Sequence, residues 1–162
     1  MIRLLLIFIL PFLLIQNSFG ENGAFPKKLF SDIYKIQLDT ANSHVHSDNP
    51  HEILAYDYAD FVYLLLSGLP EKYQAWQKRH KERLNHISST SSTISIKEYC
   101  SSEINLHWAL IYWRFGDYVK SGIYLRKAYK NLISIQQDYP EMHEVNKSLG
   151  LLHILLSAIP DE

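Results

Sequence analysis

Cysteine is almost absent from this sequence of 162 residues. The single cysteine, Cys100, cannot form a disulfide within the chain, so the hydrophobic core alone must hold the fold together. Neither sign of charge is in excess, because 16 Lys and Arg residues stand against 17 Asp and Glu residues. The net charge of −1 gives no general attraction to nucleic acid or to anionic lipid, and we expect no nucleic-acid partner.

Recognised catalytic motifs are also missing. The sequence has no Gly-rich phosphate loop, no nucleophile elbow and no HExxH zinc motif. We interpret Cys100 as a small buried apolar residue rather than a catalytic thiol, and His107 and His153 as packing residues of apolar helices. The expectation is therefore a protein that is not an enzyme and needs no cofactor.

The N-terminus has the pattern of an export signal. A basic residue, Arg3, precedes an apolar run over residues 4–15, and the small residues Ser18 and Gly20 suit a signal peptidase. Because the run is short for a bilayer span, we predict a signal peptide over residues 1–20 and an exported protein of the periplasm or cell envelope. The alternative is a retained anchor, which would be the chain's contact with the membrane.

Apolar residues recur at helical spacing through most of the remaining chain, which predicts an all-α fold of antiparallel helical hairpins. One start signal is strong, because Asn49 can cap a helix, Pro50 suits its first position and Glu52 lies three residues after the cap. Gly68 followed by Pro70 ends that helix and begins the next. The predicted helices cover residues 26–38, 50–67, 70–87, 96–115, 118–139 and 141–158.

The helix over residues 70–87 has a narrow apolar stripe of Tyr73, Trp76, His80 and Leu84. Its other faces are rich in Lys and Arg, including Arg79 and Arg83, and we interpret them as solvated surface rather than as a site for a membrane or an acidic partner. The Ser/Thr tract over residues 88–95 is predicted to be a flexible linker between an N-terminal helical unit, residues 21–87, and a second region, residues 96–162.

The second region contains a hairpin that turns at Phe115-Gly116-Asp117-Tyr118. In its second arm we expect one buried stripe, formed by Tyr118, Gly122, Leu125, Tyr129 and Leu132 with Ala128 and Ile135 alongside. Small residues are predicted to let the helices approach closely, namely Ala109, Ser121, Gly122 and Ala128.

This hairpin resembles the tetratricopeptide repeat (TPR), whose pattern combines small residues, an aromatic residue and Gly-Asp-Tyr at the turn. The matching positions are Ala109, Tyr112, Gly116, Asp117, Tyr118, Ser121, Tyr124 and Ala128. A second partial match is Leu149-Gly150, which lies 41 residues after the pair Trp108-Ala109. The sequence from Glu103 to Asp161 is also similar to a group of uncharacterised exported TPR proteins from Bacteroidetes-type bacteria. The resemblance implies a right-handed solenoid and a protein-interaction role.

The final predicted helix has an apolar face, formed by Leu149, Leu152, Leu155, Leu156 and Ile159, with no further helix after it to cover that face. Since a repeat unit does not bury its apolar face alone, we expect an incomplete array, truncated at its C-terminus. The alternative is that the N-terminal hairpins cover this helix.

The TPR phase directs a set of first-helix residues toward the inner curve of the array: Glu103, Leu106, Leu110, Trp113 and Arg114. The last helix would add Glu144, Lys147, Leu151 and Ile154. Trp113 next to Arg114 is a combination that can anchor a peptide, although Trp113 could instead pack on the next helix. A weak metal candidate is formed by His44, His46 and His51, for which a solvated polar loop is the simpler interpretation.

These observations favour an exported, TPR-like protein-interaction scaffold of the cell envelope, with a protein or peptide partner. The alternative is a helical accessory domain of an envelope enzyme whose catalytic part is absent from this chain.

Overall fold

The computed structural model describes residues 47–157, and the side chains of residues 47–154. This part of the chain folds into five α-helices and contains no β-strand, which confirms the all-α prediction for the described residues. The helices are α3 (Pro50–Ser67), α4 (Pro70–Ser89), α5 (Ile94–Arg114), α6 (Tyr118–Asp138) and α7 (Glu144–Ser157). The predicted signal peptide, the predicted helix over residues 26–38 and the last residues of the chain lie outside the described range.

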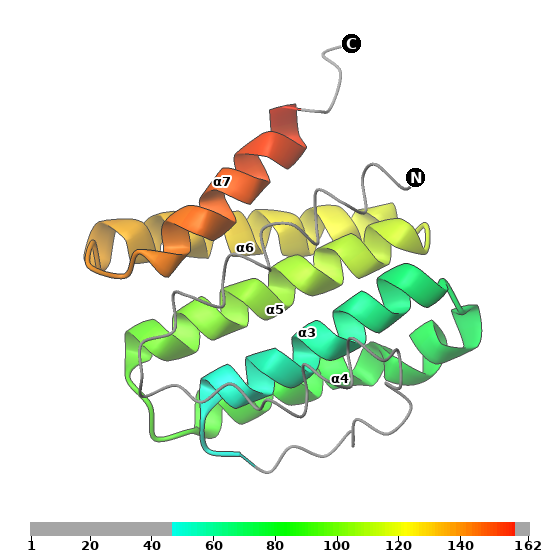
Figure 1. Cartoon of the computed structure of the whole chain (residues 1–162), viewed down its shortest axis with the longest axis horizontal. Helices are drawn as coiled ribbons and strands as arrows, with labels where there is room; N and C mark the ends of the chain where they lie inside the picture. The colour runs from blue at the N-terminus through cyan, green and yellow to red at the C-terminus, as the bar shows by residue number, and fades with distance from the viewer. Residues whose placement is uncertain (1–46, 158–162) are drawn as a thin grey trace.

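The helices form two antiparallel pairs and a fifth helix (Figure 1). Helix α5 lies in the middle and contacts α3, α4 and α6, while α7 packs mainly against α6 and tilts away from it toward its C-terminus. A single hydrophobic core runs through all five helices, and its fully buried members include Ile53, Leu64, Ile87, Ile104, Trp108, Leu132 and Leu152. No helix among residues 47–157 is both long enough and apolar enough to cross a membrane.

The predicted start of α3 at Asn49 and Pro50 is confirmed, but the backbone N–H of Asn49 donates to Oγ of Ser47 at 3.0 Å rather than to the carboxylate of Glu52. Asn49 is the N-cap, and its side-chain oxygen accepts a hydrogen bond from the backbone N–H of His51 at 3.0 Å. Pro50 occupies the first helical position, where the lack of a backbone N–H costs nothing. Asp117 caps α6 in the same manner by accepting from the backbone N–H of Lys120 at 3.3 Å.

Two of the four connections between the described helices have a glycine with positive φ. Gly68 ends α3 with φ of 62°, and Gly116 joins α5 to α6 with φ of 83°. Residues with a Cβ atom are disfavoured in this left-handed region. The predicted turns at Gly68 and Gly116 are therefore confirmed, and each turn fixes the position at which its hairpin reverses.

The substitution Gly68→Ala is expected to lower the free energy of unfolding by about 1–2 kcal/mol, because alanine is strained at this φ. The new Cβ would also lie 2.6 Å from Nη2 of Arg114, which must move away. Gly116→Ala is the matched variant, since it shares the backbone strain but has no neighbour within 4 Å. Gly122→Ala, inside α6 and facing open space, should instead raise the stability by about 0.5–1 kcal/mol. Urea unfolding measures the free energy of unfolding of all three variants. A higher stability of Gly68→Ala would contradict the role of the positive φ at this turn.

The buried face of α6 differs from the prediction. Tyr118 is 67% exposed and Gly122 is also exposed, so neither belongs to the buried stripe. The observed stripe consists of Ser121, Ala128, Leu132 and Ile135, with Leu125 partly buried between them. The proposed role of Gly122 in close helix packing is likewise wrong, because nothing lies within 4 Å of the position where its Cβ would be. Ala109 and Ala128, by contrast, are fully buried as expected.

Three further boundaries and faces differ from the prediction. Helix α4 continues through Ser89 and α5 begins at Ile94, so part of the Ser/Thr tract is helical and only residues 90–93 connect the two helices. Helix α7 begins at Glu144 rather than at residue 141. On α4, Arg83 is buried in the protein rather than solvated.

Candidate functional site

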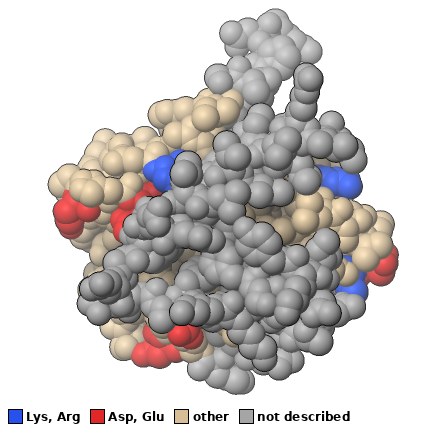
Figure 2. Space-filling view, viewed as in Figure 1, with Lys and Arg blue, Asp and Glu red and all other residues tan. Residues whose placement is uncertain are grey.

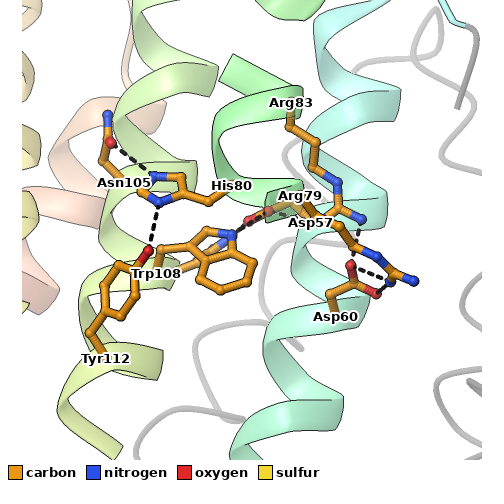
Figure 3. Close-up of polar contacts among 9 residues, drawn as sticks. Asp57, Asp60, Arg79, His80, Arg83, Asn105, Trp108 and Tyr112 are labelled. Carbon is orange, nitrogen blue, oxygen red and sulfur yellow. Dashed lines mark hydrogen bonds and ion pairs between the residues drawn. The ribbon is translucent and has the colours of Figure 1, made fainter. Parts of the chain in front are cut away.

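A buried network of charged side chains joins α3 to α4. Asp57 is fully buried and accepts a hydrogen bond from Nη1 of Arg83 at 2.8 Å. Asp60, one turn later on α3, accepts from Nη2 of Arg83 at 2.6 Å and binds Nη1 of Arg79 through both of its oxygens. The two acids therefore face two guanidinium groups, and the paired charges balance within the network (Figure 3).

Helix α5 adds two donors to the same carboxylate. Nδ1 of His107 donates to Oδ2 of Asp57 at 2.9 Å, and the indole N–H of Trp108 donates to Oδ1 at 2.9 Å. Burial alone would raise the pKa of Asp57, but the hydrogen bond from His107, the charge of Arg83 and the bond from Trp108 together lower it. For Arg83, burial opposes the charge, yet Asp57 and Asp60 raise its pKa overall. Asp57 is therefore an ionised acceptor shared by three helices.

A second buried group surrounds His80 of α4. Its Nε2 lies 3.2 Å from the side-chain oxygen of Asn105, and its Nδ1 lies 3.4 Å from the hydroxyl of Tyr112 (Figure 3). The imidazole stacks on Trp108, with 5.3 Å between the ring centroids, and meets the edge of Tyr124 at 4.4 Å. Burial lowers the pKa of His80, although the charge of Asp57 opposes this effect. The ring is thus held neutral between α4, α5 and α6.

Neither buried group was identified as a unit from the sequence. Asp57 and Asp60 are three residues apart on one helix, and Arg79 and Arg83 are four residues apart on the next, so each pair shares a helix face. This spacing, together with the presence of acidic residues on an otherwise apolar helix, was the feature of the sequence that could have indicated a buried ion-pair network. Because the network is buried, we infer that its role is structural: it fixes α3, α4 and α5 relative to one another.

This fixed geometry brings the two hairpin turns together at one end of the protein. The guanidinium of Arg114, at the end of α5, lies against Gly68 in the α3–α4 turn. Tyr73 of α4 stacks on Phe115 of the α5–α6 turn, with 4.3 Å between centroids and 4° between planes. Figure 1 shows both turns at the same end of the helices.

Four exposed apolar side chains lie in these turns or within a few residues of them in the chain, and we call them the turn surface: Leu66, Leu69, Trp113 and Tyr118. Trp113 is 56% exposed, and Arg114 beside it is exposed as well. Large exposed apolar side chains that cluster on one surface are typical of interaction sites. The turn surface is therefore the candidate functional site of the described residues.

The sequence-predicted groove is only partly available at the surface. Glu103 and Leu106 are buried, at 7% and 2% exposure, and Leu110 is partly buried, so the first part of the predicted row does not form an open face. Trp113 and Arg114 are exposed and lie on the turn surface. On α7, the predicted residues Glu144, Lys147 and Ile154 are exposed and Leu151 is partly buried. Gly150, expected to define a repeat, faces open space.

The metal candidate falls largely outside the described residues, which include His51 but not His44 or His46. Nδ1 of His51 lies 3.9 Å from Sγ of Cys100, and burial lowers the pKa of this histidine. Within residues 47–157, no three His, Cys, Asp or Glu side chains come close enough to hold a metal ion. Cys100 is fully buried, as predicted, and burial raises the pKa of its thiol.

Comparison with known proteins identifies no relative of this chain. No family model matches the chain, and neither curated proteins nor solved structures give a significant match.

Proposed function

We propose that this protein is an exported, TPR-like interaction scaffold of the cell envelope and that a protein or peptide partner binds at its turn surface. The observation that carries the proposal is that Trp113 and Arg114 are both exposed and lie next to each other at the end of α5. Aromatic and arginine side chains supply most of the energy at protein interfaces when they are held in place before binding. Here the stacking of Tyr73 on Phe115 joins α4 to the α5–α6 turn beside this pair.

The repeat interpretation is supported by the arrangement of the pairs. The first helices α3 and α5 contact each other, and each is followed by a turn with a glycine of positive φ. The capping Asp117 and the buried Ala109 and Ala128 occupy the positions that the TPR pattern assigns to them. Two features depart from the pattern, since Tyr118 is exposed and α7 packs mainly on α6. An accessory domain of an envelope enzyme remains the alternative, because it would use the same kind of surface.

The double substitution Trp113→Ala with Arg114→Ala is expected to weaken partner binding by about 2 kcal/mol or more, roughly 30-fold, since each is a typical hot-spot residue. Its effect on the free energy of unfolding should be small because both side chains are exposed. The measurement is capture from a cell-envelope extract by the immobilised full chain, followed by titration of each captured protein against both variants.

The matched control is Ile94→Ala with Lys78→Ala, which also removes an exposed apolar side chain and an exposed cation. Ile94 is at the opposite end of α5 from Trp113. Equal losses in the two double variants would show that the turn surface is not the docking site. If the captured protein is an enzyme whose activity changes on binding, the accessory-domain alternative is favoured over the scaffold.

A further inference from the structure

The outward face of α6 carries a second pattern that the turn surface does not include. Val119, Ile123, Arg126 and Lys130 follow one another at intervals of four, three and four residues, so they share one helix face. All four are exposed, with Val119 at 76% and Ile123 at 59%. This face lies opposite the buried stripe of Ser121, Ala128, Leu132 and Ile135. We call these four residues the outer stripe.

The outer stripe is apolar in its first half and basic in its second half. Lys127 adds a further exposed cation beside it, and the only acidic residue of α6 is Asp138, at its last position. At the other end, the charge of Asp117 is paired with Lys120 through a contact of 2.6 Å. The outer stripe therefore combines exposed aliphatic side chains with a local excess of positive charge.

This local excess contrasts with the rest of the chain. The whole sequence has a net charge of −1. The described residues visible in Figure 2 carry basic and acidic groups in separate small patches rather than one field of a single sign. Attraction of α6 to an anionic surface would thus come from the local charge of this helix and not from the net charge of the whole molecule.

We propose that the outer stripe of α6 binds the surface of an anionic lipid membrane. Interfacial helices combine Lys and Arg with apolar and aromatic residues, and the cations bind lipid headgroups while the apolar side chains enter the headgroup region. The outer face of one helix is convex, and a bilayer accommodates a convex surface without needing a matching groove.

The test uses the full chain with a reporter placed on α6, because the apolar run over residues 4–15 can bind lipid regardless of charge. Ile123→Cys is labelled with an environment-sensitive fluorophore, and buried Cys100 stays unlabelled. Vesicles of phosphatidylcholine mixed with phosphatidylglycerol should shift the emission to the blue, whereas vesicles of phosphatidylcholine alone should not. The same label at Gln74→Cys, an exposed position on α4, should not respond.

In this labelled background, Arg126→Gln with Lys130→Gln should weaken the response to anionic vesicles by about 25-fold, or about fivefold for each cation removed. The charge-matched control, Lys78→Gln with Lys147→Gln, changes two exposed lysines on α4 and α7 and should leave the response nearly unchanged. Val119→Ser in the same background should also weaken it, because an apolar contact is lost.

Three results would overturn the proposal: no blue shift at residue 123 with anionic vesicles, an equal shift at residue 74, or equal losses in the two charge-matched variants. If the reporter responds instead to an acidic protein captured from the envelope extract, the outer stripe is a protein-docking face. The vesicle test is independent of the proposed scaffold function, because its variants leave Trp113 and Arg114 intact.

Discussion

Replacing Asp57 with alanine is expected to lower the free energy of unfolding by about 3–5 kcal/mol. The substitution leaves Nδ1 of His107 and the indole N–H of Trp108 buried without their acceptor, and it removes one of the two carboxylates bound to Arg83. Unpaired buried donors and charges are among the most costly changes in a protein interior. Since a domain is stable by about 5–15 kcal/mol, a large share of the total would be lost.

Urea unfolding followed by circular dichroism measures this change. Asp60→Ala should cost less, because Arg79 is partly exposed and retains its contact with the ring of Trp76, 4.1 Å from the ring centroid. Glu98→Ala removes an exposed acid of α5 and should change the stability by less than about 0.5 kcal/mol. A cost below about 1 kcal/mol for Asp57→Ala would mean that the network contributes little to stability.

Asp57→Asn provides a milder form of the same test, because the amide keeps the size of the side chain and one acceptor oxygen.

Acidification is expected to destabilise the protein in two separate pH ranges. Burial lowers the pKa of His80 below its ordinary value of 6.5, so the unfolded chain takes up this proton first and stability falls as the pH drops below 6.5. His51, whose pKa burial also lowers, acts in the same direction. Asp57 acts at lower pH: although burial opposes it, the bond from His107 and the charge of Arg83 lower its pKa below 3.8. Its stabilising contribution is present above pH 3.8 and is lost as the pH falls through the folded-state pKa.

The measurement is the free energy of unfolding, obtained by urea titration at a series of pH values from neutral to acidic. His80→Gln keeps a donor and an acceptor but does not titrate, so the variant should show a smaller loss in the upper range. Asp57→Asn should instead flatten the lower range. Constant stability of the wild-type protein between neutral pH and pH 5 would contradict the assignment of His80 as a buried neutral ring.

Local signals in the sequence were sufficient for the existence of the five described helices and for some of their ends. The cap at Asn49 and the two glycine turns act through contacts within a few residues, so their chemistry can be read without the tertiary structure. The buried face of α6 was placed incorrectly because Tyr118 is large and apolar enough to suggest burial, whereas the predicted Tyr129 is partly buried against the core. Periodicity alone allowed a stripe that began at Tyr118, whereas packing against α5 selects one that begins at Ser121.

The charged network was missed for a different reason, although the spacing of its residues was visible in the sequence. Arg79 and Arg83 were assigned to the solvent because charged residues are rarely buried without a partner. Their partners are on another helix, and only the packing of α3 against α4 brings Asp57 and Asp60 to them. Trp113 and Arg114 could be selected from the sequence as an exposed pair, but the contact of Arg114 with the Gly68 turn required the fold.

The shared carboxylate of Asp57 also bears on how the protein opens. Because it joins α3 to α4 through Arg83 and to α5 through His107 and Trp108, none of these helices can detach without breaking a buried bond. These three helices should therefore separate as one cooperative unit. Helix α7, which packs mainly against α6, is not held by that carboxylate, and its attachment depends instead on the apolar side chains that it adds to the core, Val145, Leu149 and Leu152.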